Sequence, residues 1–137
     1  MECTRDSKFA NAKCASAAGT RQRVSVGRLD VWRDWGYAPE YVEAMWSMLQ
    51  RDEPDDFVIA TGEAHTIAEF ATAAFAEFDL DAAQHIDIDE TLFRPSDISW
   101  SRGAPAKAER VLGWTARTKF SELVKILCEA EKRSAEC

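Results

Sequence analysis

Apolar residues recur at helical spacing after Pro39, a residue that suits the first turn of a helix. The residues on one side of this predicted helix are Val42, Met45, Trp46 and Leu49. Because a stripe of this kind usually faces a core, we expect these side chains to be buried. Glu40 should then lie on the opposite side, in solvent.

A second amphipathic helix is predicted to follow Thr66. Glu69 stands three residues after Thr66, which is the spacing of a capping box. The residues predicted to form its buried stripe are Ile67, Phe70, Ala71, Ala74, Phe75 and Phe78.

The remaining elements are short. Residues 23–27 and 85–89 alternate between apolar and polar positions and predict strands, and residues 57–61 form an apolar run typical of a buried strand. Further helices are expected at 6–18, 106–114 and 120–133.

Together these elements predict an α+β fold: a small, helix-rich domain with a few short strands. No segment is suited to the central parallel sheet of a Rossmann domain. The length of 137 residues fits a single domain, residues 1–137.

Charge and composition exclude several classes of function. The net charge of −7 makes nucleic acid an unfavourable partner, and no apolar run is long enough to span a membrane. The N-terminus lacks the apolar centre of a secretory signal, so we expect a cytoplasmic protein. The four cysteines show no C-x-x-C spacing and lie far in sequence from both histidines, which predicts no metal site.

The motifs of a self-sufficient enzyme are absent from the sequence. There is no G-x-G-x-x-G, no P-loop and no G-x-S-x-G, and neither tyrosine has a lysine four residues later. The chain therefore predicts no catalytic residues and no bound cofactor of its own.

Two loops carry residues that could grip a phosphate. Arg33 lies between two tryptophans, and Arg94 stands beside a proline that stiffens the chain, with Asp97 three residues on. The planar guanidinium group of arginine matches two phosphate oxygens at once. The alternative for Arg33 is a structural role, such as an ion pair with Asp34.

Several motifs resemble the C-terminal part of GDP-mannose 4,6-dehydratases. They are GRLDVWRDWGYAPEYVEAMWSMLQ (27–50), DEPDDFVIATGEAHT (52–66), FRPSD (93–97), KAERVLGW (107–114) and FSELVKIL (120–127). The resemblance extends over residues 19–133, whereas residues 1–18 align weakly.

The resemblance implies an extended short-chain dehydrogenase/reductase. In that family an N-terminal Rossmann half holds NADP and the catalytic residues, and the C-terminal half binds the nucleotide sugar. The family reaction converts GDP-mannose to GDP-4-keto-6-deoxymannose. The resemblance here covers only the second half, so the expected fold is that of the C-terminal substrate domain.

The family's binding residues can be carried over position by position. The resemblance implies that Arg33 and Arg94 bind the pyrophosphate and that Asp97 binds the ribose. Lys8 corresponds to a lysine of the substrate region. Arg28 departs from the pattern, because the family has asparagine there.

These residues lead to one functional hypothesis and two alternatives. The first is a partial GDP-mannose 4,6-dehydratase that binds GDP-mannose weakly and is inactive alone, although its family is a family of lyases. The second is a non-catalytic interaction module that binds a partner or self-associates as a homo-oligomer through apolar surface. The third is one half of a split dehydratase, completed by a separate Rossmann protein.

Overall fold

The computed structural model describes residues 23–135, so the predicted helix at 6–18 and Lys8 lie outside the described residues. The chain forms two compact units. Among the described residues, the first unit consists of residues 23–31, of Thr66–Ser99 and of residues 124–135. The second consists of Trp32–His65 and Trp100–Leu123. The predicted α+β class is confirmed, since helices and a few short strands make up both units.

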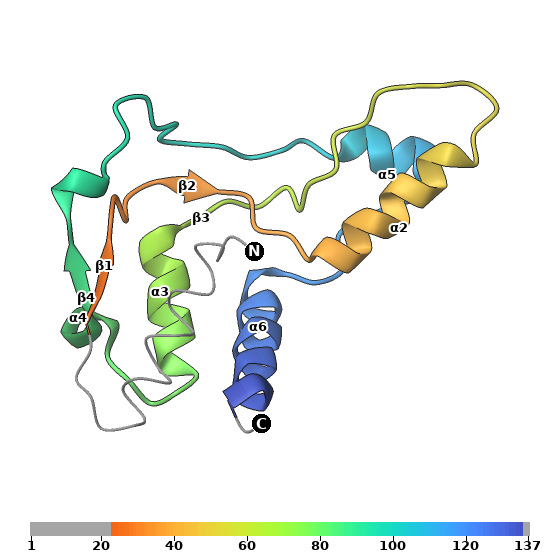
Figure 1. Cartoon of the computed structure of the whole chain (residues 1–137). Helices are drawn as coiled ribbons and strands as arrows, with labels where there is room; N and C mark the ends of the chain where they lie inside the picture. The colour runs from red at the N-terminus through yellow and green to blue at the C-terminus, as the bar shows by residue number, and fades with distance from the viewer. Residues whose placement is uncertain (1–22, 136–137) are drawn as a thin grey trace. The chain divides into compact units, whose positions relative to one another are not determined.

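The first unit contains a parallel pair of strands, β1 (Val24–Val26) and β4 (Ile86–Ile88), as Figure 1 shows. Both strands were predicted from alternation. Val24 is in register with Ile86, and the two strands are separated by a long stretch of chain. Parallel strands need such a crossover, since no tight turn can join them.

Helix α3 (Ile67–Ala76) has the predicted capping box. The Glu69 backbone N–H donates to Thr66 Oγ1 at 3.0 Å, and the Thr66 backbone N–H donates to Glu69 Oε2 at 2.7 Å. The predicted stripe of α3 is buried, apart from Phe78, which is half-buried. Local sequence therefore determines both where this helix begins and which side it buries.

Helix α6 (Phe120–Ala135) begins in the second unit and ends in the first. In the first unit its Cys128 thiol lies 3.8 Å from the Ala74 carbonyl of α3, and both residues are buried. Lys132 donates to the Glu77 carbonyl at 2.9 Å, which joins the helix to the end of α3.

Two short helices flank β4. Asp81 caps α4 (Ala82–His85), and Asp89 caps the 3₁₀ helix η1 (Glu90–Leu92). Asp81 and Asp89 stand near Asp79 and Asp87 in an acidic stretch of the sequence. Their side chains accept backbone N–H groups that would otherwise lack partners.

In the second unit, α2 (Ala38–Leu49) lies beside α5 (Ala106–Leu112) (Figure 1). Their shared core contains Ala44, Ala108 and the buried Trp114. Gly113, at φ 66°, ends α5 in the left-handed conformation. A two-residue strand, β2, lies at Trp32–Arg33 in this unit, and another, β3, lies at His65–Thr66, where the chain passes from the second unit to the first.

The predicted burial of α2 is wrong. Trp46 is 64% exposed and Leu49 82% exposed, and Val42 and Met45 are exposed as well, whereas Glu40 and Ala44 are buried. The helix has a second apolar side, around Ala44, Tyr41 and Met48, and the described chain covers that side. Periodicity identifies apolar sides but not which of them this chain covers.

The predicted strand at 57–61 is also absent from the described structure. A strand requires a neighbouring backbone to accept and donate its hydrogen bonds. No described segment pairs with residues 57–60 in this way. The apolar run is present, but without a paired backbone it forms no strand in the described structure.

Candidate functional site

Arg33 lies on a stretch of backbone that is held from both sides. The Ser101 backbone N–H donates to the Trp32 carbonyl at 3.2 Å, and the Trp35 indole N–H donates to the His65 carbonyl at 3.2 Å. Arg33 itself is half-buried, and its Nη1 donates to the Trp32 carbonyl at 2.7 Å. The guanidinium group therefore extends from an anchored segment.

Asp34, the next residue, is a structural carboxylate. Its Oδ1 accepts the Thr61 backbone N–H at 2.9 Å and the Thr61 hydroxyl at 2.6 Å. Its Oδ2 accepts the backbone N–H groups of Gly62 at 3.1 Å and Gly103 at 3.2 Å. One side chain thus joins three segments that are distant in the sequence.

Gly103 leaves the space that this arrangement needs. A Cβ atom at position 103 would collide with the Cβ of Ala60 and would lie 3.2 Å from Cγ1 of Val58. A side chain there would push residues 58–60 away and would stretch the hydrogen bond from Gly103 to Asp34.

Glu40 is a second buried carboxylate with a structural role. Its Oε1 accepts the Thr118 hydroxyl at 2.7 Å, and its Oε2 accepts the Arg117 backbone N–H at 2.9 Å. The Trp114 indole N–H donates to the Glu40 carbonyl at 2.9 Å. Burial alone would raise the pKa of Glu40, but the hydrogen bonds and the positive charge of Arg117 prevail and lower it.

The second predicted phosphate-binding residue, Arg94, is in the first unit, in the loop after η1. Its side chain is exposed, and within residues 23–135 no hydrogen bond or ion pair involves it. Asp97, in the same loop, is half-buried. The structure therefore brings Arg94 and Asp97 into one loop, while Arg33 belongs to the second unit.

Arg28, which stands where the family has asparagine, is a charged residue of the same unit as Asp97. It forms a two-point ion pair with Asp30, from Nε to Oδ1 at 2.9 Å and from Nη2 to Oδ2 at 2.6 Å. The hydrogen bonds to Asp30 and its charge raise the pKa of Arg28, and the negative charge of Asp97 adds to that effect. Arg28 and Asp97 therefore lie within electrostatic reach of each other. No feature of the sequence indicates this proximity.

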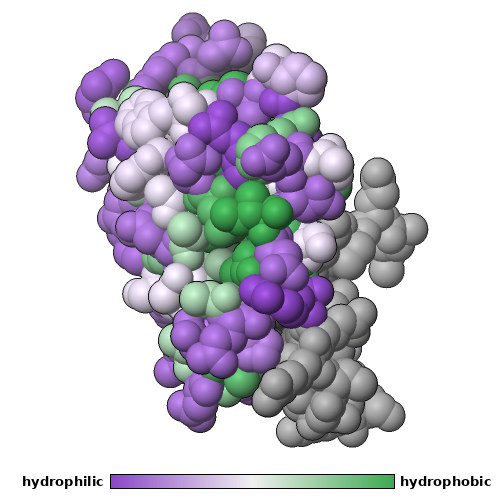
Figure 2. All heavy atoms as spheres, turned by 90° about the vertical axis from the view of Figure 1, so that its left-hand side faces the viewer, coloured by the Kyte–Doolittle hydropathy of each residue, from purple (hydrophilic) through white to green (hydrophobic). Residues whose placement is uncertain are grey.

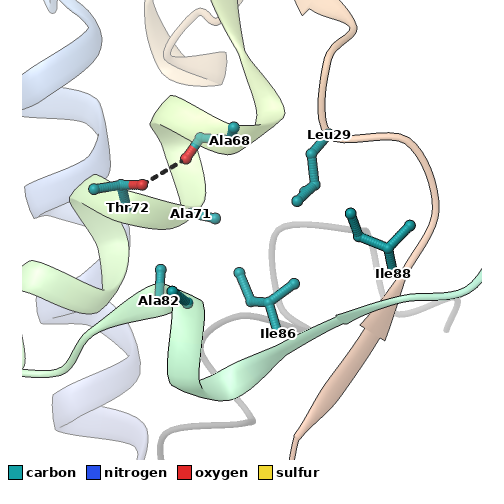
Figure 3. A pocket seen from close by; sticks show the side chains of 8 residues that line it. Leu29, Ala68, Ala71, Thr72, Ala82, Ile86 and Ile88 are labelled. Carbon is teal, nitrogen blue, oxygen red and sulfur yellow. Dashed lines mark hydrogen bonds between the residues drawn. The ribbon is translucent and has the colours of Figure 1, made fainter.

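The first unit also contains an apolar pocket of about 290 Å³. Leu29, Ile86 and Ile88 extend into it from the strand side, and Ala71 of α3 lies opposite them (Figure 3). Figure 2 shows an apolar patch, surrounded by hydrophilic residues, on the side of the molecule where β1 and β4 lie in Figure 1. Neither Arg94 nor Asp97 lines the pocket, and its lining contains no ionisable side chain.

The described residues offer no group of three or more histidine, cysteine, aspartate or glutamate side chains that could hold a metal ion. Among the helices of residues 23–135, none combines the length and apolar character required to cross a membrane.

The fold has counterparts among solved structures. RMD from Pseudomonas aeruginosa, complexed with NADPH, matches with a TM-score of 0.78 at 18% identity, over 94% of this chain and 41% of that one. dTDP-glucose 4,6-dehydratase from Bacillus anthracis, in complex with NAD, matches with a TM-score of 0.78 at 11% identity, over 94% of this chain and 40% of that one. This chain therefore shares its fold with part of each of these two proteins.

Comparison of the sequence identifies the family of the chain more specifically than its fold does. The family model for GDP-mannose 4,6 dehydratase matches residues 3–127. GDP-mannose 4,6 dehydratase 1 of Arabidopsis thaliana is 39% identical over 118 residues, which cover 86% of this chain and 33% of that protein. The human GDP-mannose 4,6 dehydratase is 38% identical over 130 residues, which cover 82% of this chain and 35% of that protein.

The chain therefore belongs to the GDP-mannose 4,6-dehydratase family, as its motifs predicted. It spans about a third of the length of the curated relatives it matches.

Proposed function

We propose that this chain is the nucleotide-sugar-binding part of a GDP-mannose 4,6-dehydratase and that its ligand is GDP-mannose. The observation that carries the proposal is the family match over residues 3–127, together with relatives whose names specify GDP-mannose. Solved structures of similar fold include complexes with UDP-glucose and with UDP, so folds of this kind accommodate nucleotide sugars.

Two arginines bind the diphosphate in this proposal. Arg33 supplies a guanidinium group from an anchored segment, and Arg94 supplies a second one from an exposed loop. Asp97 accepts hydrogen bonds from the ribose hydroxyls, for which a carboxylate is suited. Lys8, outside the described residues, is assigned to the same ligand by the family resemblance alone.

The chain alone carries out no chemistry in this proposal. The NADP site and the catalytic residues are assigned to the part of the relatives that this chain does not match. Each arginine contact to a diphosphate contributes about 1.5–3 kcal/mol. Two such contacts without the rest of the site give a dissociation constant on the order of 0.1–1 mM.

Binding and turnover are tested separately. Calorimetric titration with GDP-mannose should show weak, saturable binding, and titration with mannose alone should show none. Incubation of the chain with NADP and GDP-mannose, followed by mass spectrometry, should show no keto sugar. Product formed by the chain alone, or binding of mannose equal to that of GDP-mannose, would contradict the proposal.

A second function, that of an interaction module, is favoured by one observation. Four large apolar side chains of α2 are more than half exposed. Apolar surface gathered in this way commonly marks a binding interface. Nucleotide binding and partner binding are compatible.

A further inference from the structure

Arg28 lies on a stretch of backbone that is held beside the loop after η1. Strand β1 ends two residues before Arg28, and the Val26 carbonyl at its end accepts the Asp89 backbone N–H at 2.8 Å. Gly27 lies so close to the end of η1 that a Cβ atom there would be 3.1 Å from the Leu92 carbonyl oxygen. Because Arg28 follows Gly27 directly, its backbone is fixed next to the start of that loop.

The chain after Arg28 is anchored as well. The Leu29 carbonyl accepts the Ala68 backbone N–H at 3.0 Å, in the first turn of α3. The loop after η1 contains Arg94 and Asp97, which the proposed function assigns to the diphosphate and to the ribose. Arg28 and these two residues therefore belong to one part of the first unit.

The guanidinium group of Arg28 is held along one edge by Asp30. Its Nε donates to Oδ1 at 2.9 Å, and its Nη2 donates to Oδ2 at 2.6 Å. Two parallel hydrogen bonds of this kind fix the plane of the group as well as its position. The hydrogen bonds and charge of Asp30 raise the pKa of Arg28, and the contribution of the Asp97 charge agrees with the closeness of that loop.

Another edge of the guanidinium group is available to a ligand. Among the N–H donors of an arginine, Asp30 takes one from Nε and one from Nη2. Within residues 23–135, Nη1 of Arg28 forms no hydrogen bond. Nη1 and the second hydrogen of Nη2 therefore form a fork of two parallel donors, in the plane that Asp30 fixes.

Guanine presents the pair of acceptors that such a fork matches. Its O6 and N7 atoms accept hydrogen bonds side by side, whereas adenine has a donor, the N6 amino group, in place of O6. In the proposed ligand the base is bonded to the ribose, so a donor fork near Asp97 lies at the base end of the ligand.

We infer that Arg28 is a specificity-determining residue that binds the guanine base through O6 and N7, and that Asp30 is the residue that positions it. The presence of a nucleotide rests on the proposed function, to which the inference adds the residue that selects the base. The family resemblance does not supply this role, because the family has asparagine at the position of Arg28.

NMR chemical-shift titrations of the full chain with four nucleotides test the inference. GDP and inosine diphosphate both present O6 and N7, so the chain should bind them with similar affinity. ADP has an amino group in place of O6, and 7-deaza-GDP lacks the N7 acceptor. Both should bind about ten-fold more weakly than GDP.

Four variants separate base recognition from attraction between charges. Arg28→Ala should bind GDP and ADP equally, and so should Arg28→Lys, which keeps the positive charge but not the planar fork. Asp30→Ala leaves the guanidinium plane unfixed and should reduce the ratio of GDP affinity to ADP affinity about three-fold, a ratio that a merely structural role would not change. Arg23→Ala removes an arginine that pairs with Asp87 in the same unit, and it should keep the wild-type preference.

The spectra of the free variants show whether each is folded, and Arg28→Lys carries the test if Arg28→Ala is not. A preference for GDP over ADP that survives both substitutions of Arg28 overturns the inference. So does inosine diphosphate or 7-deaza-GDP behaving contrary to expectation in the wild type, or an equal loss of GDP and ADP affinity in Arg28→Ala, which would assign Arg28 to the phosphates. In these cases a nucleotide still binds and the proposed function stands, whereas binding of no nucleotide overturns both.

Discussion

The carboxylate of Asp34 and the backbone N–H of Gly103 are joined by a 3.2 Å hydrogen bond across 69 positions of sequence. The same carboxylate accepts hydrogen bonds from Thr61 and Gly62. Asp34 is therefore required for the local fold, while its neighbour Arg33 is assigned to the ligand. If Arg33 binds the ligand as proposed, adjacent residues of one motif have separate roles.

Asp34→Asn should lower the free energy of unfolding by about 2–3 kcal/mol. The substitution replaces one acceptor oxygen with an NH₂ group, which would then face backbone N–H donors instead of accepting from them. Urea unfolding followed by circular dichroism measures this change. Asp56→Asn, at an exposed position in a loop, is the matched control and should change stability by less than about 0.5 kcal/mol. Equal effects of the two substitutions would show that the Asp34 contacts do not stabilise the protein.

Gly103→Ala should destabilise the protein by about 1–3 kcal/mol, because the added methyl group collides with Ala60. The same urea titration measures it. Ser101→Ala, two residues away and exposed, should be nearly neutral, since only its backbone forms a described contact. A neutral Gly103→Ala would mean that residues 58–60 shift aside at no cost.

Glu40 should make stability depend on pH in the acid range. Its pKa is lowered in the folded protein, so its contribution is complete above the unfolded value of about 4.3 and is lost as the pH falls through the folded value. Glu40→Gln should cost about 2–3 kcal/mol at pH 7, and the difference from wild type should shrink at pH 3. Urea unfolding at both pH values measures this.

Glu43→Gln is the control for Glu40. Glu43 is exposed and pairs with Arg117 at 2.6 Å, so its loss should cost less than about 1 kcal/mol. A difference between wild type and Glu40→Gln that is the same at both pH values would contradict the electrostatic role assigned to Glu40.

The capping box of α3 yields a local prediction. Thr66→Ala removes the side-chain acceptor of the Glu69 backbone N–H and should cost about 1 kcal/mol. Thr72→Ala, in the same helix, should be neutral or slightly stabilising, because its hydroxyl bonds only to the Ala68 carbonyl of the preceding turn. Thermal unfolding of the two variants compares them directly, and an equal loss in both would exclude the cap as the cause.

The sequence predicted those features that depend on neighbouring residues. The start and buried side of α3 follow from a cap and a stripe within a single helix. The alternation of residues 23–27 and 85–89 predicted two strands, but their mutual pairing is a long-range property that no local pattern contains.

The features that sequence reasoning missed depend on distant partners. Glu40 looks like a solvent-facing helix residue, and only its contacts with Arg117 and Thr118 explain its burial. Trp46 looks like a core residue, and the described chain leaves it exposed. In both cases periodicity distinguishes the sides of a helix, but which side is buried depends on the segment that packs against it.

The candidate site was predicted only through the family resemblance. Arginines in loops are common, and neither Arg33 nor Arg94 stands out by spacing or composition. The electrostatic link of Arg28 to Asp97 is a property of the folded chain. The assignment of these residues to a nucleotide sugar therefore stays a prediction until a ligand is measured.

Calorimetric titration of GDP-mannose into the wild type, Arg33→Ala, Arg94→Ala and Arg110→Ala tests the central claim most directly. Arg110 is an exposed arginine of α5 and serves as the charge-matched control. We predict weak binding to the wild type and to Arg110→Ala, and affinity at least ten-fold lower in the other two variants. Affinity that is equal in all four proteins, or no binding to the wild type, would contradict the claim that Arg33 and Arg94 hold a sugar nucleotide.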